Sequence, residues 1–393
     1  MVTGTGVTTV RTEPAVERMR QLRRAFHRRP ELAYEEIETA RTVMAELERL
    51  GIPYDYGGKG GGVVGRLAGA APGPRIALRA EMDALPCSEE TGLPFASEVP
   101  GRMHACGHDA HMAIVLGAAA RLAADPPPGS VVFVFQPAEE LGNGARVMVD
   151  AGALHGVDAI FAGHVTTQYR VGEIMVADGT ITAHSDRFGI EVHGESGHGA
   201  RPHEAIDAVV VTGLLITAIQ SLVSRHVNPV SPSVVTIGSV HAGTAANIIA
   251  GHAALEGIIR TTRPDTREEI IAGLHRAARA LGDLYRARIE VTLGESCPAV
   301  VNTQREAAVA AAAARDVVSA DRIVRQEHPS MGAEDFSYFL QRTPGCYVRF
   351  GASADGEYIP LHHPRFDVDE GVLEVGARFF ERAVRHATTG GIR

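Results

Sequence analysis

The sequence lacks the features of a secreted protein. Cysteine is scarce, with four in 393 residues, and such scattered thiols do not form the disulfide framework of a small extracellular domain. The first ten residues have no basic segment that leads into an apolar core, so they do not resemble a secretion signal. We therefore expect a reducing cytoplasm as the location. The cysteines are Cys87, Cys106, Cys297 and Cys346.

Positive charge and long apolar runs are lacking as well. The 38 lysines and arginines are outnumbered by 47 aspartates and glutamates, which gives a net charge of -9 and a pI near 6.1. This balance argues against nucleic acid or an anionic membrane as the main partner. The longest apolar stretch, 205–223, contains Asp207, Gly213 and Gln220, so no membrane span is predicted. Tryptophan is absent too, which decides no chemistry.

The length and the rhythm of short apolar runs predict an α/β protein of about two domains. The runs at 75–78, 131–135 and 159–162 each end in polar residues, and helical stretches separate several of them. This alternation favours a catalytic domain with a largely parallel sheet flanked by helices. In such sheets, ligands bind beyond the carboxyl ends of the strands.

The rhythm changes after about residue 185. Four strand-like runs and two helical runs follow in the order β-α-β-β-α-β, which is typical of a ferredoxin-like α+β module. We predict that this module, at 185–296, is inserted into a discontinuous catalytic domain formed by 1–184 and 297–393. The strands are expected at 188–193, 233–240, 253–261 and 288–293, and the helices at 205–226 and 267–286.

The segment from Met103 to His111 concentrates three histidines, one cysteine and one aspartate in nine positions. An apolar run follows at once and predicts a buried helix, so this segment is the loop that leads into its first turn. Cys106 and His108 are two residues apart and can converge on one centre. Thiolate, imidazole and carboxylate form the ligand set of a zinc-like ion. The alternative is a buried thiol with a few surface histidines.

Glu139 and Glu140 follow the strand at 131–135. One of the two carboxylates can bind a metal while its neighbour stays free to act as the general base for a metal-activated water. His164 and His362 add two imidazoles at predicted strand ends, although either alone is more often structural. Five side chains would suffice for two metal ions that share bridging ligands: Cys106, His108, Glu140, His164 and His362.

Motifs along nearly the whole chain resemble a family of metal-dependent amidohydrolases and peptidases. This family includes aminoacylases, carboxypeptidase G, hippurate hydrolases and auxin-amino-acid conjugate hydrolases, and the similarity is closest to the hippurate and auxin-conjugate branch. The motifs are Phe-His-Arg-Arg-Pro-Glu-Leu at 26–32, Met-Asp-Ala-Leu-Pro at 82–86, His-Ala-Cys-Gly-His-Asp at 104–109, Gln-Pro-Ala-Glu-Glu at 136–140, Gly-His-Gly-Ala-Arg-Pro-His at 197–203, Gly-Ala-Glu-Asp-Phe at 332–336 and Leu-His at 361–362.

The resemblance implies two divalent metal ions per subunit. It assigns Glu139 as the base that activates water and then protonates the leaving amine. Zinc fits thiolate and imidazole best, with manganese, cobalt or nickel as alternatives. The implied metal ligands are Cys106, His108, Glu140, His164 and His362, with Cys106 as the bridge.

The resemblance also implies substrate contacts and a homodimer, with the inserted domain as a dimerisation or lid domain. His198 matches a histidine of this domain that contacts the reaction oxyanion. In relatives, this histidine comes from the partner subunit of a dimer. Asn247 and Arg260 match positions that hold the substrate's carbonyl and carboxylate; without the family they are a turn asparagine and an exposed strand arginine. Asp83 and Asp109 match carboxylates that fix the tautomer of a ligand imidazole.

Other motif positions carry less defined roles, and two positions depart from the family. Glu81 stands where relatives more often have aspartate, and the residues after His164 lack the usual Trp-Pro pair, which leaves the accepted acyl group open. We expect His363 to be a bystander. Three further motif histidines are expected to be structural or to support the ligands: His104, His111 and His203.

The leading hypothesis is therefore hydrolysis of the amide bond of N-acyl amino acids or similar carboxylate-bearing amides. One alternative is a metallo-exopeptidase or dipeptidase that uses the same site. Another is a cysteine hydrolase with Cys106 as the nucleophile, which an alkylating reagent would inactivate and a chelator would not. The last is a non-catalytic metal-binding protein, against which the retained Glu139 argues.

Overall fold

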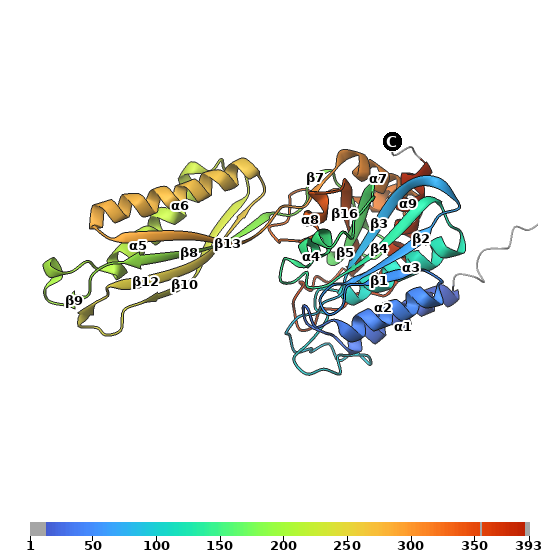
Figure 1. Cartoon of the computed structure of the whole chain (residues 1–393), viewed down its shortest axis with the longest axis horizontal. Helices are drawn as coiled ribbons and strands as arrows, with labels where there is room; N and C mark the ends of the chain where they lie inside the picture. The colour runs from blue at the N-terminus through green and yellow to red at the C-terminus, as the bar shows by residue number, and fades with distance from the viewer. Residues whose placement is uncertain (1–12, 354–355, 390–393) are drawn as a thin grey trace, which may run out of the picture. The chain divides into compact units, whose positions relative to one another are not determined.

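The computed structural model describes residues 13–353 and 356–389, and the chain forms two compact units (Figure 1). The first unit consists of the residues up to Ile181, Val301–Glu327 and the residues from Asp335 on. The second consists of Thr182–Val300 and His328–Glu334. The predicted bounds of the inserted domain, 185–296, and its role as a lid or dimerisation domain stay predictions.

The first unit is built on an eight-stranded sheet with the strand order β1-β2-β4-β3-β5-β16-β6-β15. The neighbours β4, β3, β5 and β16 run parallel. This mixed α/β architecture with a large, mostly parallel sheet confirms the predicted fold class. The strands are β1 (Tyr54–Tyr56), β2 (Val63–Ala68), β3 (Ala71–Glu81), β4 (Pro128–Gln136), β5 (Ala159–Arg170), β6 (Ile174–Met175), β15 (Ile323–Val324) and β16 (Gly345–Ser353), and a separate pair is formed by β7 (Gly179–Thr180) and β14 (Val301–Asn302).

Helices cover this sheet and enclose the main core. The central helix α3 is buried along most of its length because it packs against α1, α9 and β3. This contact explains why its sequence is apolar almost without interruption. Burial on both faces likewise explains the continuous apolar runs of β3 and β4. The helices are α1 (Glu13–Arg28), α2 (Ile37–Arg49), α3 (His108–Ala124), α4 (Gly144–Asp150), α7 (Gln304–Val317), α8 (Ser337–Leu340) and α9 (Gly371–Thr389), with a short 3₁₀ turn η3 (Ala320–Arg322).

One strand extends further than the sequence predicted. The expected strand at 159–162 was to end before His164, but β5 continues to Arg170. The reason lies in its two neighbours: β3 pairs with β5 only as far as Ala162, whereas β16 pairs with it up to Arg170. The polar residues after Ala162 therefore mark the point where β3 and β5 stop pairing, and His164 lies inside a strand at this point.

The second unit has a four-stranded antiparallel sheet with the order β10-β12-β8-β13. Helices α5 and α6 pack on one face and bury alternate residues of the strands. The elements are β8 (His184–His193), β9 (Gly197–His198), η1 (Pro202–Glu204), α5 (Ala208–Ser221), η2 (Leu222–His226), β10 (Ser233–Ala242), β11 (Ile248–Ile249), β12 (His252–Thr261), α6 (Pro264–Tyr285) and β13 (Arg288–Cys297).

The helical stretch Ala208–His226 is long and apolar enough to cross a membrane by length and composition alone. Core helices of soluble proteins pass the same test, so one such helix is weak evidence. In the structure, one side of the stretch packs in the core of the second unit through Val211, Leu215 and Ile219. This packing accounts for the apolar residues on that side, whereas Val209, Val210 and Leu214 are exposed.

Candidate metal centre

The turn before α3 brings Cys106 and His108 against β5. Gly107 occupies the N-cap of α3 with φ +85°, a conformation that suits glycine. A Cβ atom at Gly107 would lie 2.4 Å from Cγ2 of Val165, so only glycine allows this approach. The loop therefore lies directly beside the part of β5 that carries His164.

The predicted ligand residues converge in space. The Sγ atom of Cys106 lies 3.3 Å from Nε2 of His164. Potential ligand atoms lie within 4.8 Å of one another in each of three overlapping groups: Cys106 with His108 and His164, Cys106 with Glu140 and His362, and His108 with Glu139 and Glu140. Side chains from four distant segments thus surround one location, while their roles as ligands stay predictions.

Backbone carbonyl groups fix the tautomers of two of these imidazoles. Nδ1 of His108 donates to the carbonyl oxygen of Asp83 at 2.8 Å, and Nδ1 of His164 donates to that of Val165 at 2.7 Å. A carbonyl oxygen only accepts, so the proton of each neutral ring lies on Nδ1. The Nε2 lone pairs of His108 and His164 then remain available for a metal ion.

Glu139 and Glu140 lie in the turn between β4 and α4. The N–H of Glu140 donates to Oδ2 of Asp83 at 2.9 Å, which ties this turn to the end of β3. His362 reaches the site from the segment after β16, where its N–H donates to the carbonyl oxygen of Ala105 at 2.8 Å. Nε2 of His362 lies 3.5 Å from Oε1 of Glu140. Local hydrogen bonds therefore hold both segments at the centre.

The charge and the open donor atoms of the site fit a pair of divalent cations. Nε2 of His108, Oε1 of Glu140 and Oδ1 of Asp83 are buried and have no hydrogen-bond partner among the described residues. Burial lowers the pKa of His108, but the carboxylate of Asp83, whose Oδ1 lies 3.5 Å from Nδ1, and the charge of Glu81 outweigh it and raise this pKa to about 10. Carboxylates therefore favour a positive charge at His108, and a metal ion bound to its Nε2 would supply one.

His111 supports this centre and is unsuited to bind metal itself. Its Nε2 accepts the N–H of Val165 at 2.9 Å, and its Nδ1 donates to Oε2 of Glu81 at 2.8 Å. Both ring nitrogens are therefore occupied. Glu81 in turn pairs with Arg79, which is fully buried and also contacts Asp335 at 3.0 Å. Arg79 and Asp335 were not predicted as site residues. The position of Arg79 directly after the apolar run at 75–78 was the one sequence feature that could have indicated a buried arginine.

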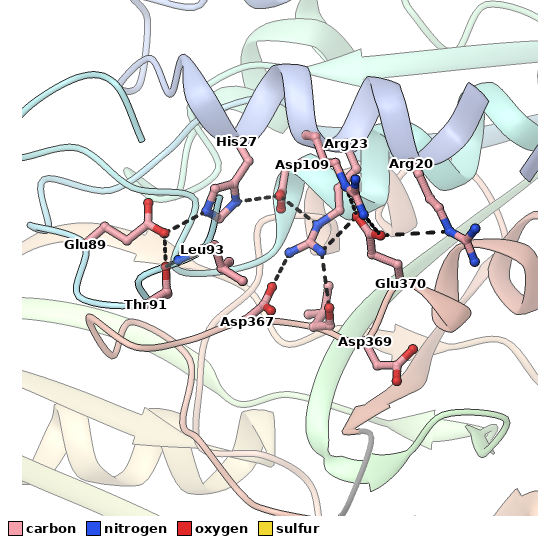
Figure 2. A network of polar contacts seen from close by, with 12 residues as sticks. Arg20, Arg23, His27, Glu89, Thr91, Leu93, Asp109, Asp367, Asp369 and Glu370 are labelled. Atoms are coloured by element: carbon pink, nitrogen blue, oxygen red, sulfur yellow. Dashed lines mark hydrogen bonds and ion pairs between the residues drawn. The ribbon is translucent and has the colours of Figure 1, made fainter. Parts of the chain in front are cut away.

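Asp109, the residue after His108, takes part in a largely buried polar network (Figure 2). Its Oδ2 accepts from Nε of Arg23 at 3.2 Å and from Nδ1 of His27 at 2.8 Å. Nε2 of His27 lies 3.2 Å from Oε1 of Glu89, and Arg23 also pairs with Asp367. The network connects α1 to the first turn of α3. Among the described residues, Asp109 makes no hydrogen bond to a predicted ligand imidazole, and its predicted role of fixing the tautomer of such an imidazole finds no contact to support it.

This network predicts a pH-dependent contribution to stability. Burial lowers the pKa of His27, but Asp109 and Glu89 outweigh it and raise the pKa from 6.5 to about 9. A raised histidine pKa stabilises the folded state fully below pH 6.5, and this contribution is lost as the pH rises through 9. The shift corresponds to about 3 kcal/mol.

We therefore expect His27→Gln to reduce the free energy of unfolding strongly at pH 6 and much less at pH 9.5, as measured by urea denaturation. His155→Gln, at an exposed histidine, is the matched control and should show no such pH dependence. An equal effect of His27→Gln at both pH values would contradict a charged His27.

The structure brings His198 and Asn247 together within the second unit but leaves Arg260 apart. His198 pairs with Ile248 across β9 and β11, and the N–H of Gly199 donates to the carbonyl oxygen of Asn247 at 2.9 Å. Arg260 lies eight residues beyond the start of β12, roughly 27 Å along the strand. Arg260 therefore cannot contact the same small substrate as His198 and Asn247 of the same unit.

The remaining motif histidines have different surroundings. His104 is buried, its ring nitrogens have no hydrogen-bond partner among the described residues, and burial lowers its pKa to about 4. His203 is exposed in η1. Nδ1 of His363 accepts the N–H of Arg365 at 3.1 Å, a local turn contact. None of the three belongs to the groups of potential ligand atoms among the described residues.

Comparisons with known proteins extend over both units. The profile of peptidase family M20/M25/M40 matches residues 77–386. Thermostable carboxypeptidase 1 of Saccharolobus solfataricus is 39% identical over 365 residues, which cover 91% of this chain and 92% of that protein. N-acetylcysteine deacetylase of Bacillus subtilis is 38% identical over 368 residues, which cover 92% of this chain and 95% of that protein.

A solved structure shares both the fold and a substantial part of the sequence. It is that of a Bacillus subtilis protein described as a dinuclear metal binding peptidase. The TM-score is 0.84 at 33% identity, and the match covers 96% of this chain and 99% of that chain.

Proposed function

Because the chain belongs to peptidase family M20/M25/M40, we propose that it hydrolyses the amide bond of N-acyl amino acids or similar carboxylate-bearing amides. The family match confirms the resemblance predicted from the motifs, and the chain is a hydrolase with amidohydrolase and peptidase relatives. The proposal adds a mechanism and a substrate class to this coarser conclusion.

The observation that carries the proposal is the convergence of thiol, imidazole and carboxylate groups beside Glu139. Cys106, His108, Glu140, His164 and His362 would hold two divalent cations, and their donor atoms suit zinc. Bound at this position, the cations would polarise the substrate carbonyl and lower the pKa of a water molecule to about 7.

Glu139 would then transfer the proton of the attacking water to the leaving amine. A carboxylate oxygen of Glu139 lies within 4.8 Å of potential ligand atoms of His108 and Glu140 and would accept the proton of the attacking water. The same carboxyl group would deliver this proton to the leaving amine, so that it acts first as base and then as acid. The N–H of Asp335, 3.5 Å from Oε1 of Glu139, orients the carboxylate.

His198 and Asn247 are proposed to contact the reaction oxyanion and the substrate carbonyl. Arg260 is proposed to bind the substrate carboxylate, since its Nη1 is buried without a hydrogen-bond partner among the described residues. Because Arg260 lies far from the other two, we propose that the site is completed in a homodimer, in which His198 and Asn247 serve the partner's site. Sedimentation equilibrium should give twice the chain mass of 41.6 kDa; a monomer that retains full activity would contradict this arrangement.

A panel of substrates tests the reaction class. N-acetyl, N-benzoyl and long-chain N-acyl amino acids are compared with dipeptides at equal concentration, with release of the free amino acid as the readout. We expect the N-acyl amino acids to have the higher kcat/KM. The similarity to a carboxypeptidase favours an exopeptidase as the second candidate, and higher kcat/KM for the dipeptides would establish that candidate instead.

The cysteine-hydrolase alternative fits the site poorly. Burial raises the pKa of the Cys106 thiol well above its ordinary value, and the charge of Glu140 adds to this effect. A thiol that resists ionisation is a weak nucleophile, whereas a metal ion stabilises its thiolate. The cytoplasmic location stays a prediction.

A further inference from the structure

The turn that carries Glu139 and Glu140 begins with an alanine in the left-handed region. Ala138 has φ +52°, a conformation that strains a non-glycine residue and persists only where the surroundings hold it. Three other described non-glycine residues have positive φ, and two of them contact residues near this turn. The hydroxyl of Tyr34 donates to Oδ1 of Asn143 at 2.5 Å, and Nε2 of His362 lies 3.5 Å from Oε1 of Glu140. The third, Arg286, belongs to the second unit.

The side chain that holds Ala138 in this conformation is Glu36. Its Oε1 accepts the N–H of Ala138 at 2.8 Å, across 102 residues of sequence. Glu36 is 4% exposed and occupies the N-cap of α2, yet its side chain makes no capping hydrogen bond to this helix. A side-chain cap would stabilise α2, but this carboxyl group binds the turn instead of its own helix.

A second buried carboxylate holds the other side of Glu139. The N–H of Glu140 donates to Oδ2 of Asp83 at 2.9 Å, so the backbone groups before and after Glu139 are both bound. The turn also closes tightly, because a Cβ atom at Gly144 would lie 1.7 Å from the carbonyl oxygen of the residue before Ala138. The directions of the Glu139 and Glu140 side chains therefore depend on these two contacts.

From this geometry we propose that Glu36 is a positioning residue of the metal centre. By accepting the Ala138 N–H it holds the left-handed turn that directs Glu140 toward the cations and Glu139 toward the water. The inference rests on the proposed function for the roles of these two glutamates. The contact requires only an oxygen acceptor at the right distance, and burial raises the pKa of Glu36 to about 7, which is compatible with an uncharged acceptor.

Two substitutions of Glu36 test separately whether the length or the charge of its side chain matters. In Glu36→Asp the carboxyl group is one methylene shorter and should lose the Ala138 N–H, while aspartate is a favoured N-cap for α2. We expect its zinc dissociation constant, measured by competition with a chromophoric chelator, to rise roughly tenfold or more. We also expect a fall of similar size in kcat, a KM close to wild type and a Tm that does not decrease.

Glu36→Gln keeps an oxygen acceptor at the same distance and should match the wild type in zinc affinity and in kcat. Adding Ala138→Gly to Glu36→Asp should recover much of the zinc affinity, because glycine adopts the left-handed conformation without the hydrogen bond to residue 36. Should Glu36→Asp fold poorly, this double variant and Glu36→Gln still test the proposal.

Glu31→Asp is the matched control. Glu31 lies in the same loop, and its Oε2 accepts the N–H of Thr39 in α2 at 2.8 Å. This variant should lower the Tm and leave zinc affinity unchanged. Wild-type zinc affinity in Glu36→Asp, equal losses in Glu36→Gln and Glu36→Asp, or a loss of zinc affinity in Glu31→Asp would each overturn the proposal. Zinc affinity is measured without substrate, so a wild-type enzyme that fails to cleave N-acyl amino acids would refute only the proposed function.

Discussion

Replacing Glu139 by glutamine is expected to lower kcat by a factor of roughly 10²–10⁴, the contribution of a well-placed general base. Glutamine has the same shape and keeps an oxygen for the N–H of Asp335, so the turn should remain in place. It has no carboxylate to take the proton of water. The measurement is steady-state hydrolysis of the best N-acyl amino acid, together with the metal content of the same preparation.

Metal content and KM show whether Glu139→Gln has lost only the general base or has also disturbed the metal and substrate sites. Both should stay close to wild type in Glu139→Gln, because Glu139 is proposed to act on the water and Glu140 on the metal. Glu269→Gln, at an exposed position of α6, is the matched control and should be fully active. Retained turnover in Glu139→Gln would remove this residue from its proposed role.

The second large effect is expected from Cys106. Its Sγ belongs both to the group with His108 and His164 and to the group with Glu140 and His362. A side chain shared by two groups of potential ligand atoms would contact both of the proposed ions, so we expect Cys106→Ala to lose most of the bound metal and with it nearly all activity. Metal analysis of the purified variant, before and after incubation with zinc, gives the readout.

Cys346→Ala is the matched control for this experiment. Cys346 is also fully buried and also a free thiol, but it lies in the core at β16. Its removal should cost some stability and leave the metal content unchanged. If Cys106→Ala kept two ions per chain and full activity, the thiol would not be a bridging ligand.

The sequence predicts the framework of the first unit because its signals are local. The helix expected after the Met103–His111 segment is α3, although it begins at His108, inside the predicted loop, and the apolar run at 131–135 lies within β4. A run of buried residues is visible in the sequence whatever it packs against. The same holds for the glycine between Cys106 and His108, whose position before a helix is a local feature.

The convergence of ligand-type residues could be predicted from the sequence for a different reason. Ligand types after successive parallel strands meet at one edge of a sheet, and the position of His164 shows how this argument works even where a strand boundary is wrong. The polar residues after Ala162 were interpreted as the end of the strand, whereas they mark the end of pairing with β3. The centre forms at this edge in either case.

The supporting contacts had no such signal. The hydrogen bond from Ala138 to Glu36 joins residues 102 positions apart, and that from Gln136 to Asp335 joins residues 199 positions apart. The left-handed φ of Ala138 is equally hidden, since alanine rarely adopts it and nothing in the local sequence calls for it. These features depend on the assembled fold, and only the structure reveals them.

The central claim is that these side chains hold two divalent cations at one edge of the sheet. The most direct test is the anomalous scattering of crystals of the purified protein, measured at the absorption edge of the metal that elemental analysis identifies. The account predicts two peaks per chain, both within bonding distance of Cys106 Sγ, one also contacting His108 or His164 and the other Glu140 or His362. A protein that is active without bound metal, or peaks that lie away from Cys106, would contradict it.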